Sequence, residues 1–134
     1  MKFKEPKAIY LQIADRLCDE ILLGHYAPEA RIPSVREYAA LVEVNNNTVM
    51  RSFEQLQNWG VIYNKRGLGY FVAPTAVEAI RRMRQEQFLG GDLPECFRMA
   101  HLLGLTPARL AELFEEWLDK KEKTNMGNLS NNAE

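Results

Sequence analysis

The sequence predicts a mostly helical α+β fold, in which an N-terminal winged helix-turn-helix precedes a small C-terminal helical region. Residues 31–59 hold two short helical patterns with a tight connection, and two β-prone runs joined by a glycine-containing turn follow them. From residue 75 onward, apolar residues again recur at helical spacing. We therefore expect residues 1–74 to form the winged helix-turn-helix, residues 75–122 the C-terminal helical region and the polar residues 123–134 a disordered tail.

The first helix is expected over residues 8–23. Its apolar residues repeat every four positions and define a core-facing stripe: Ile9, Ile13, Leu17 and Ile21. Cys18 lies beside this stripe, where a buried thiol is the ordinary interpretation. A loop with a short strand near Arg31–Ile32 should follow this helix.

The second and third helices carry clear start signals. Ser34 and Glu37 stand in the S-x-x-E relation of a capping box, which predicts a short helix ending near residues 41–43. Asparagines tolerate turn geometry and cap helices, so residues 45–47 should join it to a helix over residues 46–59. In that helix one face is apolar and the opposite face is polar. The polar face is free to contact another molecule.

The hairpin and the C-terminal helices complete the predicted order. Residues 61–65 and 70–73 are the expected strands, and residues 66–69 join them. Helices should then begin near Thr75, Asp92 and Thr106, with Gly90-Gly91 as an interruption. Their apolar faces need a partner, and a second copy of the chain is the simplest one. The residues expected in this dimerisation region are Val77, Ile80, Phe88, Phe97, Leu110, Phe114 and Trp117.

Composition excludes several classes of function. No apolar run approaches the ~20 residues of a transmembrane helix, and no signal peptide is expected, which favours the cytoplasm. Two cysteines and two histidines lack zinc-site spacing, and no catalytic arrangement of side chains is recognisable, so we expect neither metal nor cofactor nor enzyme activity. The net charge is −1, and residues 1–74 carry nine lysines and arginines against eight acidic residues. Charge alone therefore does not predict nucleic-acid binding.

The order of the helices and strands, by contrast, does predict nucleic-acid binding. In a helix-turn-helix the second helix enters the DNA major groove with its N-terminal residues near the base edges. Asn46 and Asn47 are expected to contact bases or backbone there, the alternative being a solvated turn and cap. The Thr48 hydroxyl suits a phosphate. Met50 is either a gap-filler or a methyl contact to thymine.

Two further places could contact DNA. Ser34 and Arg36 lie at the start of the preceding helix, where the alternative for the arginine is a surface salt bridge. Lys65, Arg66 and Gly67 form a hairpin tip that could reach the minor groove or flanking phosphates. An ordinary solvated turn is the alternative there.

Residues 10–72 resemble the DNA-binding domain of GntR-type bacterial transcription regulators. The matching segments are YLQI at residues 10–13, RIPSVRE at 31–37, VNNNTV at 44–49 and RGLGYFV at 66–72. The C-terminal region, which contains LGLTP at residues 103–107, is similar to that of the YtrA-like subfamily.

The resemblance implies a homodimer on a two-fold symmetric DNA operator, acting as a repressor, with transporter genes as an expected target. By family position, DNA contacts fall to Arg36, Asn46, Asn47, Thr48, Met50, Arg66 and Gly67. Many relatives carry arginine where this chain has Asn46 and Met50, so we expect Arg51 to take over part of the backbone contact. Two alternatives stay open: a winged helix used for protein contact, and an effector sensor with its ligand between two chains.

Overall fold

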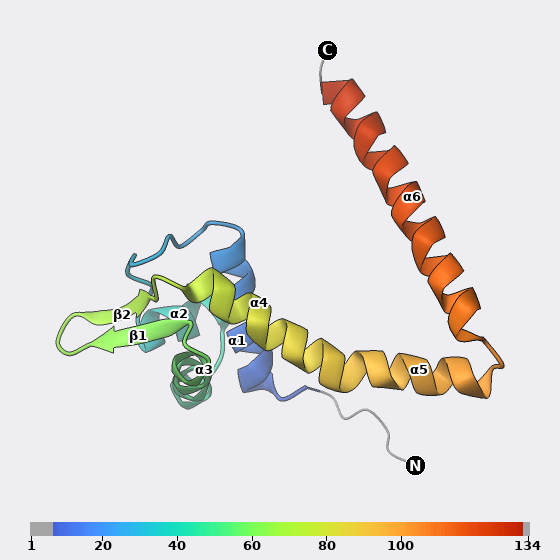
Figure 1. Ribbon diagram of the computed structural model, residues 1–134. Helices are drawn as coiled ribbons and strands as arrows, with labels where there is room; N and C mark the ends of the chain where they lie inside the picture. The colour runs from blue at the N-terminus through green and yellow to red at the C-terminus, as the bar shows by residue number, and fades with distance from the viewer. Residues whose placement is uncertain (1–6, 133–134) are drawn as a thin grey trace. The chain divides into compact units, whose positions relative to one another are not determined.

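The computed structural model describes residues 7–132, with side chains through residue 125. The chain divides into two compact units, residues 1–87 and residues 88–134 (Figure 1). Unit 1 contains α1 (Ile9–Leu22), α2 (Val35–Val42), α3 (Asn46–Asn58), β1 (Ile62–Lys65), β2 (Gly69–Val72) and α4 (Ala76–Gln87). Three helices followed by a two-stranded hairpin confirm the predicted winged helix-turn-helix and the mostly helical α+β class.

Helix α1 supplies one wall of the core of unit 1. Ile13, Leu17 and Ile21 are buried, and Cys18 is buried beside them as predicted. Ile9 is the exception to the expected stripe, because it occupies the first turn of the helix and is 61% exposed. The helix therefore packs through its last three turns and leaves its first turn accessible.

Helices α2 and α3 each begin at a residue whose side chain caps the first turn. Ser34 Oγ accepts a hydrogen bond from the Glu37 amide at 3.1 Å, and Asn45 Oδ1 accepts one from the Asn47 amide at 2.7 Å. Each bond satisfies an amide that the first turn of a helix leaves without a partner. The capping roles predicted for Ser34 and for Asn45 are thus confirmed.

An aromatic cluster joins the helix pair to the hairpin. The Phe53 ring lies 6.1 Å from that of Tyr38 on α2 and 5.0 Å, edge to face, from that of Tyr70 on β2. The Tyr38 hydroxyl donates to Glu20 Oε1 at 3.0 Å, which ties α2 to α1. Burial around Phe53 therefore fixes α3 against both of its neighbours.

The hairpin is antiparallel, with Ile62 opposite Val72 and Lys65 opposite Gly69. A third extended segment joins its outer edge, because Arg31 forms a bridge with Phe71 and the Ile32 amide donates to the Tyr70 carbonyl at 3.0 Å. This segment is the short strand that the sequence predicted near Arg31–Ile32.

Helix α4 belongs to unit 1, which corrects the expected boundary after residue 74. Ala76, Ile80 and Met83 are buried in the same core as α1 and α3. Arg84 Nη2 lies 2.8 Å from Asp19 Oδ1 and donates to the Asp15 carbonyl at 3.2 Å, so it fastens α4 to α1. The division between the units falls after residue 87 because α4 covers an apolar face of the winged helix-turn-helix itself.

Unit 2 consists of η1 (Phe88–Asp92), α5 (Leu93–Leu102) and α6 (Pro107–Asn132). Gly90 and Gly91 do not break the chain into a loop but lie in η1, one turn of π-helix. Gly104 has a φ of 77° and ends α5, and Thr106 Oγ1 accepts from the Arg109 amide at the start of α6. The capping bond confirms the helix start predicted near Thr106.

Helix α6 continues through Asn132, which corrects the expected disordered tail for residues 123–132; residues 133 and 134 lie outside the described residues. No proline interrupts this stretch, and the Thr124 hydroxyl donates to the Lys120 carbonyl at 3.0 Å within the helix. The exposed residues 121–125 need no apolar periodicity, and the polar composition of this stretch therefore gave no helical signal.

Candidate nucleic-acid interface

The N-terminal half of α3 presents a polar surface above an apolar one. Val49, Phe53 and Leu56 are fully buried, which turns the other side of the helix outward. The side chains predicted to contact DNA on this helix are mostly exposed: Asn46, Asn47, Met50 and Arg51 are accessible, and Thr48 is half-buried. Met50 is 43% exposed, so it is accessible for contact rather than a core gap-filler.

The start of α2 adds a second polar position. Ser34 uses its oxygen as an acceptor for the helix cap, and its hydroxyl proton remains available as a donor. Arg36 is exposed, and within the described part of the chain it forms no ion pair. The predicted alternative, a salt bridge to Glu37, is absent from the structure of these residues. A cation without a carboxylate partner is well suited to a phosphate.

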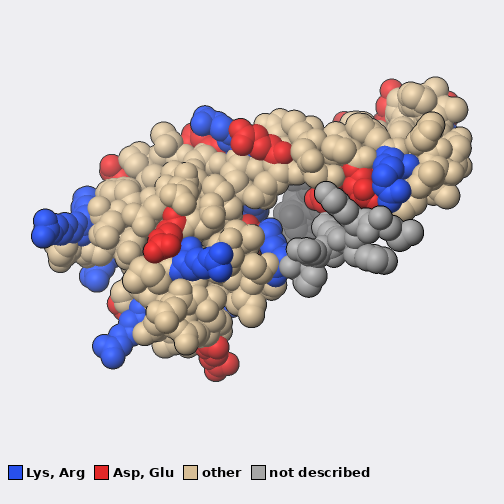
Figure 2. Space-filling view, turned by 90° about the horizontal axis from the view of Figure 1, so that it is seen from below, with Lys and Arg blue, Asp and Glu red and all other residues tan. Residues whose placement is uncertain are grey.

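The hairpin forms a positively charged tip. Lys65, Arg66 and Gly67 are exposed, and the turn is closed by the Leu68 amide donating to the Lys65 carbonyl at 2.9 Å. Lys65 Nζ lies 4.7 Å from the Phe71 ring centroid, within cation–π range, so the strand below holds this side chain in place. Figure 2 shows Lys and Arg side chains projecting at the edge of unit 1 that carries this hairpin.

Arg31, for which the sequence predicts no DNA contact, lies at the base of the same hairpin. Its guanidinium crosses Gly69, where a Cβ would come within 3.1 Å of Nε, and Gly69 has a φ of 117°. Glycine is required there both for the backbone conformation and for the close approach of the arginine. The position of Arg31 depends on its pairing with β2. The sequence predicts a short strand near Arg31–Ile32, but not the strand with which it pairs.

Tyr10 is a second residue that sequence analysis did not assign to the interface. The Arg51 guanidinium carbon lies 4.0 Å from the centroid of the Tyr10 ring. The buried Ser52 hydroxyl contacts the Tyr10 carbonyl at 2.7 Å and the Thr48 carbonyl at 3.1 Å, which fixes the start of α1 against α3. The start of α1 therefore borders the polar surface of α3.

The residues predicted for dimerisation fall into two groups. Ile80 is fully buried in unit 1 and Val77 packs against the same core, so the expectation that Ile80 contacts a second chain is corrected. The five others belong to unit 2 and remain accessible: Phe88, Phe97, Leu110, Phe114 and Trp117. Among the described side chains of unit 2, Ala100 alone is buried.

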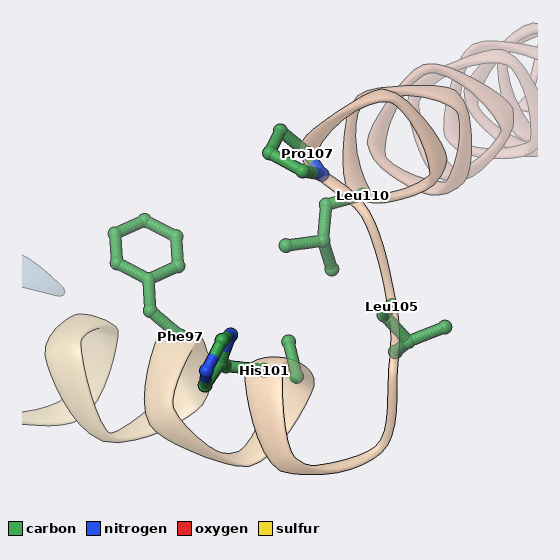
Figure 3. Close-up of a pocket in the computed structure, with 6 residues that line it drawn as sticks. Phe97, His101, Leu105, Pro107 and Leu110 are labelled. Carbon is green, nitrogen blue, oxygen red and sulfur yellow. The ribbon is translucent and has the colours of Figure 1, made fainter.

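Unit 2 also contains an apolar groove of about 420 Å³ between α5 and α6. Figure 3 shows Phe97 and His101 on one side and Pro107 and Leu110 on the other. Phe114 and Trp117 lie further along α6 with their rings nearly parallel, at an interplanar angle of 5°. Helix α6 thus presents two exposed aromatic rings beyond an apolar groove.

Within the described residues, no group of histidine, cysteine and acidic side chains is arranged to hold a metal ion. In the same part of the chain, no helix combines the length and apolar character needed to cross a membrane. The buried Cys18 thiol has its pKa raised from 9.0 to about 12, chiefly by desolvation, which makes it a core residue rather than a nucleophile.

A helix pair with a polar second helix, followed by a positively charged hairpin, defines a winged helix-turn-helix protein. A family model described as bacterial regulatory proteins, gntR family, matches residues 9–72. The regulator YhcF of Bacillus subtilis is 32% identical over 113 residues, which cover 83% of this chain and 90% of YhcF. The chain belongs to the GntR family of DNA-binding transcriptional regulators.

Similarity extends beyond the DNA-binding unit. The B. subtilis transcriptional repressor YtrA is 32% identical over 112 residues, covering 81% of this chain and 82% of YtrA. A crystal structure of a Bacteroides thetaiotaomicron protein assigned to the GntR family has a TM-score of 0.76 and 52% identity, covering 85% of this chain and 99% of that one. These matches confirm the YtrA-like assignment, and the proteins they identify are transcriptional regulators rather than enzymes.

Proposed function

We propose that this regulator is a cytoplasmic homodimer that represses transcription from a two-fold symmetric operator. The observation that carries the proposal is the incomplete core of unit 2, in which only Ala100 is buried among the described side chains. Phe97, Phe114 and Trp117 are each more than half exposed. An amphipathic helix pair of this kind is not stable in water alone, and a second copy would bury both sets of apolar side chains.

The dimer determines the form of the DNA site. Two α3 helices related by a two-fold axis would enter successive major grooves about 34 Å apart on one face of the duplex. Each would present Asn46 and Asn47 to base edges, and Arg36, Lys65 and Arg66 to the sugar–phosphate backbone or minor groove. Such a complex would exclude RNA polymerase from an overlapping promoter.

The comparison with YtrA supports repression rather than activation, since YtrA is a repressor and matches most of this chain. Transporter genes are the target class expected from this resemblance. An operator sequence obtained from the protein itself would locate the regulated genes directly.

The experiment is a selection of bound duplexes from a random DNA library at near-physiological salt. We expect an enriched inverted repeat with half-sites about one helical turn apart. Asn46→Ala or Asn47→Ala should change the selected sequence more than the affinity for random DNA. No enrichment by a folded, dimeric protein would contradict the proposal and favour a winged helix used for protein contact. Enrichment only with a cell extract of small molecules would show an effector requirement.

Salt dependence tests the backbone contacts separately. The slope of log affinity against log salt is negative, and each lost phosphate contact reduces its magnitude by about 0.9; a dimer loses two contacts per substitution, which gives a reduction of about 1.8. We expect this change for Arg36→Ala and Arg66→Ala. Arg81→Ala is the matched control, because it removes one exposed positive charge from α4 instead. Unchanged slopes in both test variants would contradict the assigned interface.

A further inference from the structure

A hollow of about 410 Å³ opens where the first turns of α1 and α3 meet. Its lining combines an apolar rim with hydrogen-bond donors: Ala8, Ile9, Tyr10, Asn47, Thr48 and Arg51. Ile9, in the first turn of α1, is 61% exposed at the rim of this hollow. The hollow is therefore open to solvent and accessible to another molecule.

Arg51 is held at the edge of this hollow by Tyr10. Its guanidinium lies 4.0 Å from the ring centroid, and among the described residues it has no carboxylate partner. A stacked guanidinium keeps the donors in its plane free, whereas an ion pair would occupy them. The aromatic ring therefore orients the arginine without neutralising it.

The position of Tyr10 is itself fixed from α3. Ser52 is fully buried, and its hydroxyl lies 2.7 Å from the Tyr10 carbonyl and 3.1 Å from the Thr48 carbonyl. The Ser52 hydroxyl thereby connects the main chain of Tyr10 to α3, the helix that carries Arg51. The stack is consequently part of the folded unit and does not depend on a bound ligand.

We propose that Tyr10 is a positioning residue that holds Arg51 so that its guanidinium, together with the Thr48 hydroxyl, binds one phosphate of the DNA backbone. The proposal rests on the DNA-binding function proposed above. A phosphate diester fits the chemistry of the hollow, because a planar guanidinium and a hydroxyl are both donors with the geometry that phosphate oxygens accept.

The test is a double-mutant cycle on Tyr10 and Arg51, read by fluorescence anisotropy with a selected operator across a salt series. Tyr10→Leu should weaken binding about fivefold to thirtyfold for the dimer, the range of two exposed cation–π contacts. Arg51→Ala should weaken binding further and reduce the magnitude of the salt slope by about 1.8. The double variant should bind no more weakly than Arg51→Ala alone.

Two conservative variants separate the role of the ring from that of the hydroxyl and of the charge. Tyr10→Phe retains the aromatic face and should bind within about twofold of wild type. Arg51→Lys retains the charge but not the planar stack, so it should keep the salt slope and lose affinity. If circular dichroism shows that Tyr10→Leu fails to fold, these two variants still test the proposal.

Several results would overturn the proposal. Multiplicative effects of Tyr10→Leu and Arg51→Ala would mean that the tyrosine acts independently of the arginine. A loss with Tyr10→Phe as large as with Tyr10→Leu would assign the contact to the hydroxyl. An unchanged salt slope in Arg51→Ala would exclude a phosphate. Failure of the proposed function can be distinguished from failure of the Tyr10–Arg51 proposal, because wild-type protein would then not bind DNA in a salt-dependent manner.

Discussion

Ile80→Ala tests whether α4 is part of the DNA-binding unit or of the dimer interface. Ile80 is fully buried beside Ala76 and Met83, in a core completed by α1 and α3. Truncating a buried isoleucine to alanine removes three side-chain carbons and leaves a cavity, which typically costs about 2–5 kcal/mol. Because small domains are stable by only about 5–15 kcal/mol, this loss is a large share of the free energy of unfolding of unit 1.

Native-state hydrogen exchange of the α3 amides measures that free energy within the full chain. We expect Ile80→Ala to lower it by about 2–5 kcal/mol, while the dissociation constant of the dimer, measured by analytical ultracentrifugation, changes little. Phe114→Ala is the matched control. Phe114 is 62% exposed in unit 2, so its truncation should weaken self-association and leave the α3 amides protected.

The opposite pattern would refute this reasoning. If Ile80→Ala dissociated the dimer while α3 protection stayed within about 0.5 kcal/mol of wild type, Ile80 would be an interface residue. The boundary between the two units would then belong after residue 74, as the sequence pattern suggested. Equal effects of both substitutions on α3 protection would show that the two units unfold together.

Three further predictions follow from local features of the fold. An alkylating reagent at pH 8 should label exposed Cys96 rapidly and buried Cys18 only on unfolding; equal labelling rates would contradict the packing of α1. Burial raises the pKa of Cys18 from 9.0 to about 12, so its stabilising contribution should be complete below pH 9 and fall between pH 9 and 12 by about 1.4 kcal/mol per pH unit. Urea unfolding of wild type and Cys18→Ala should therefore converge as pH rises through this range, and parallel pH profiles would argue against the shift. Asn45→Ala removes the cap of α3 and should cost about 1 kcal/mol of unfolding free energy in the same urea titration, and a change below about 0.3 kcal/mol would show that the cap contributes little.

The features predicted correctly from sequence are those that neighbouring residues determine. A capping side chain acts on an amide two or three positions away, as Ser34 and Asn45 do, and Gly104 ends a helix through its own φ. Such signals are complete within a few residues and survive any tertiary arrangement. The helix pair, the hairpin and most of the exposed surface of α3 follow from them.

The features that sequence analysis missed depend on contacts between distant parts of the chain. Arg31 reaches the base of the hairpin only because it pairs with β2, and Tyr10 meets Arg51 only because α1 packs against α3. Neither pair leaves a periodic signal, since each involves one residue from each element. A single sequence therefore supplies the candidates for an interface but not the neighbours that position them.

The error over α4 has a different origin. An amphipathic pattern shows that one face of a helix will be covered, but it does not identify the element that covers it. Helices α4 and α5 have similar patterns, yet Ile80 of α4 is fully buried against its own unit while Phe97 of α5 is 53% exposed. Only the exposure that remains in the folded chain distinguishes a core helix from one that needs a partner. By that criterion α4 belongs to the core of the DNA-binding unit, and the apolar side chains left exposed in unit 2 are the ones that need a partner.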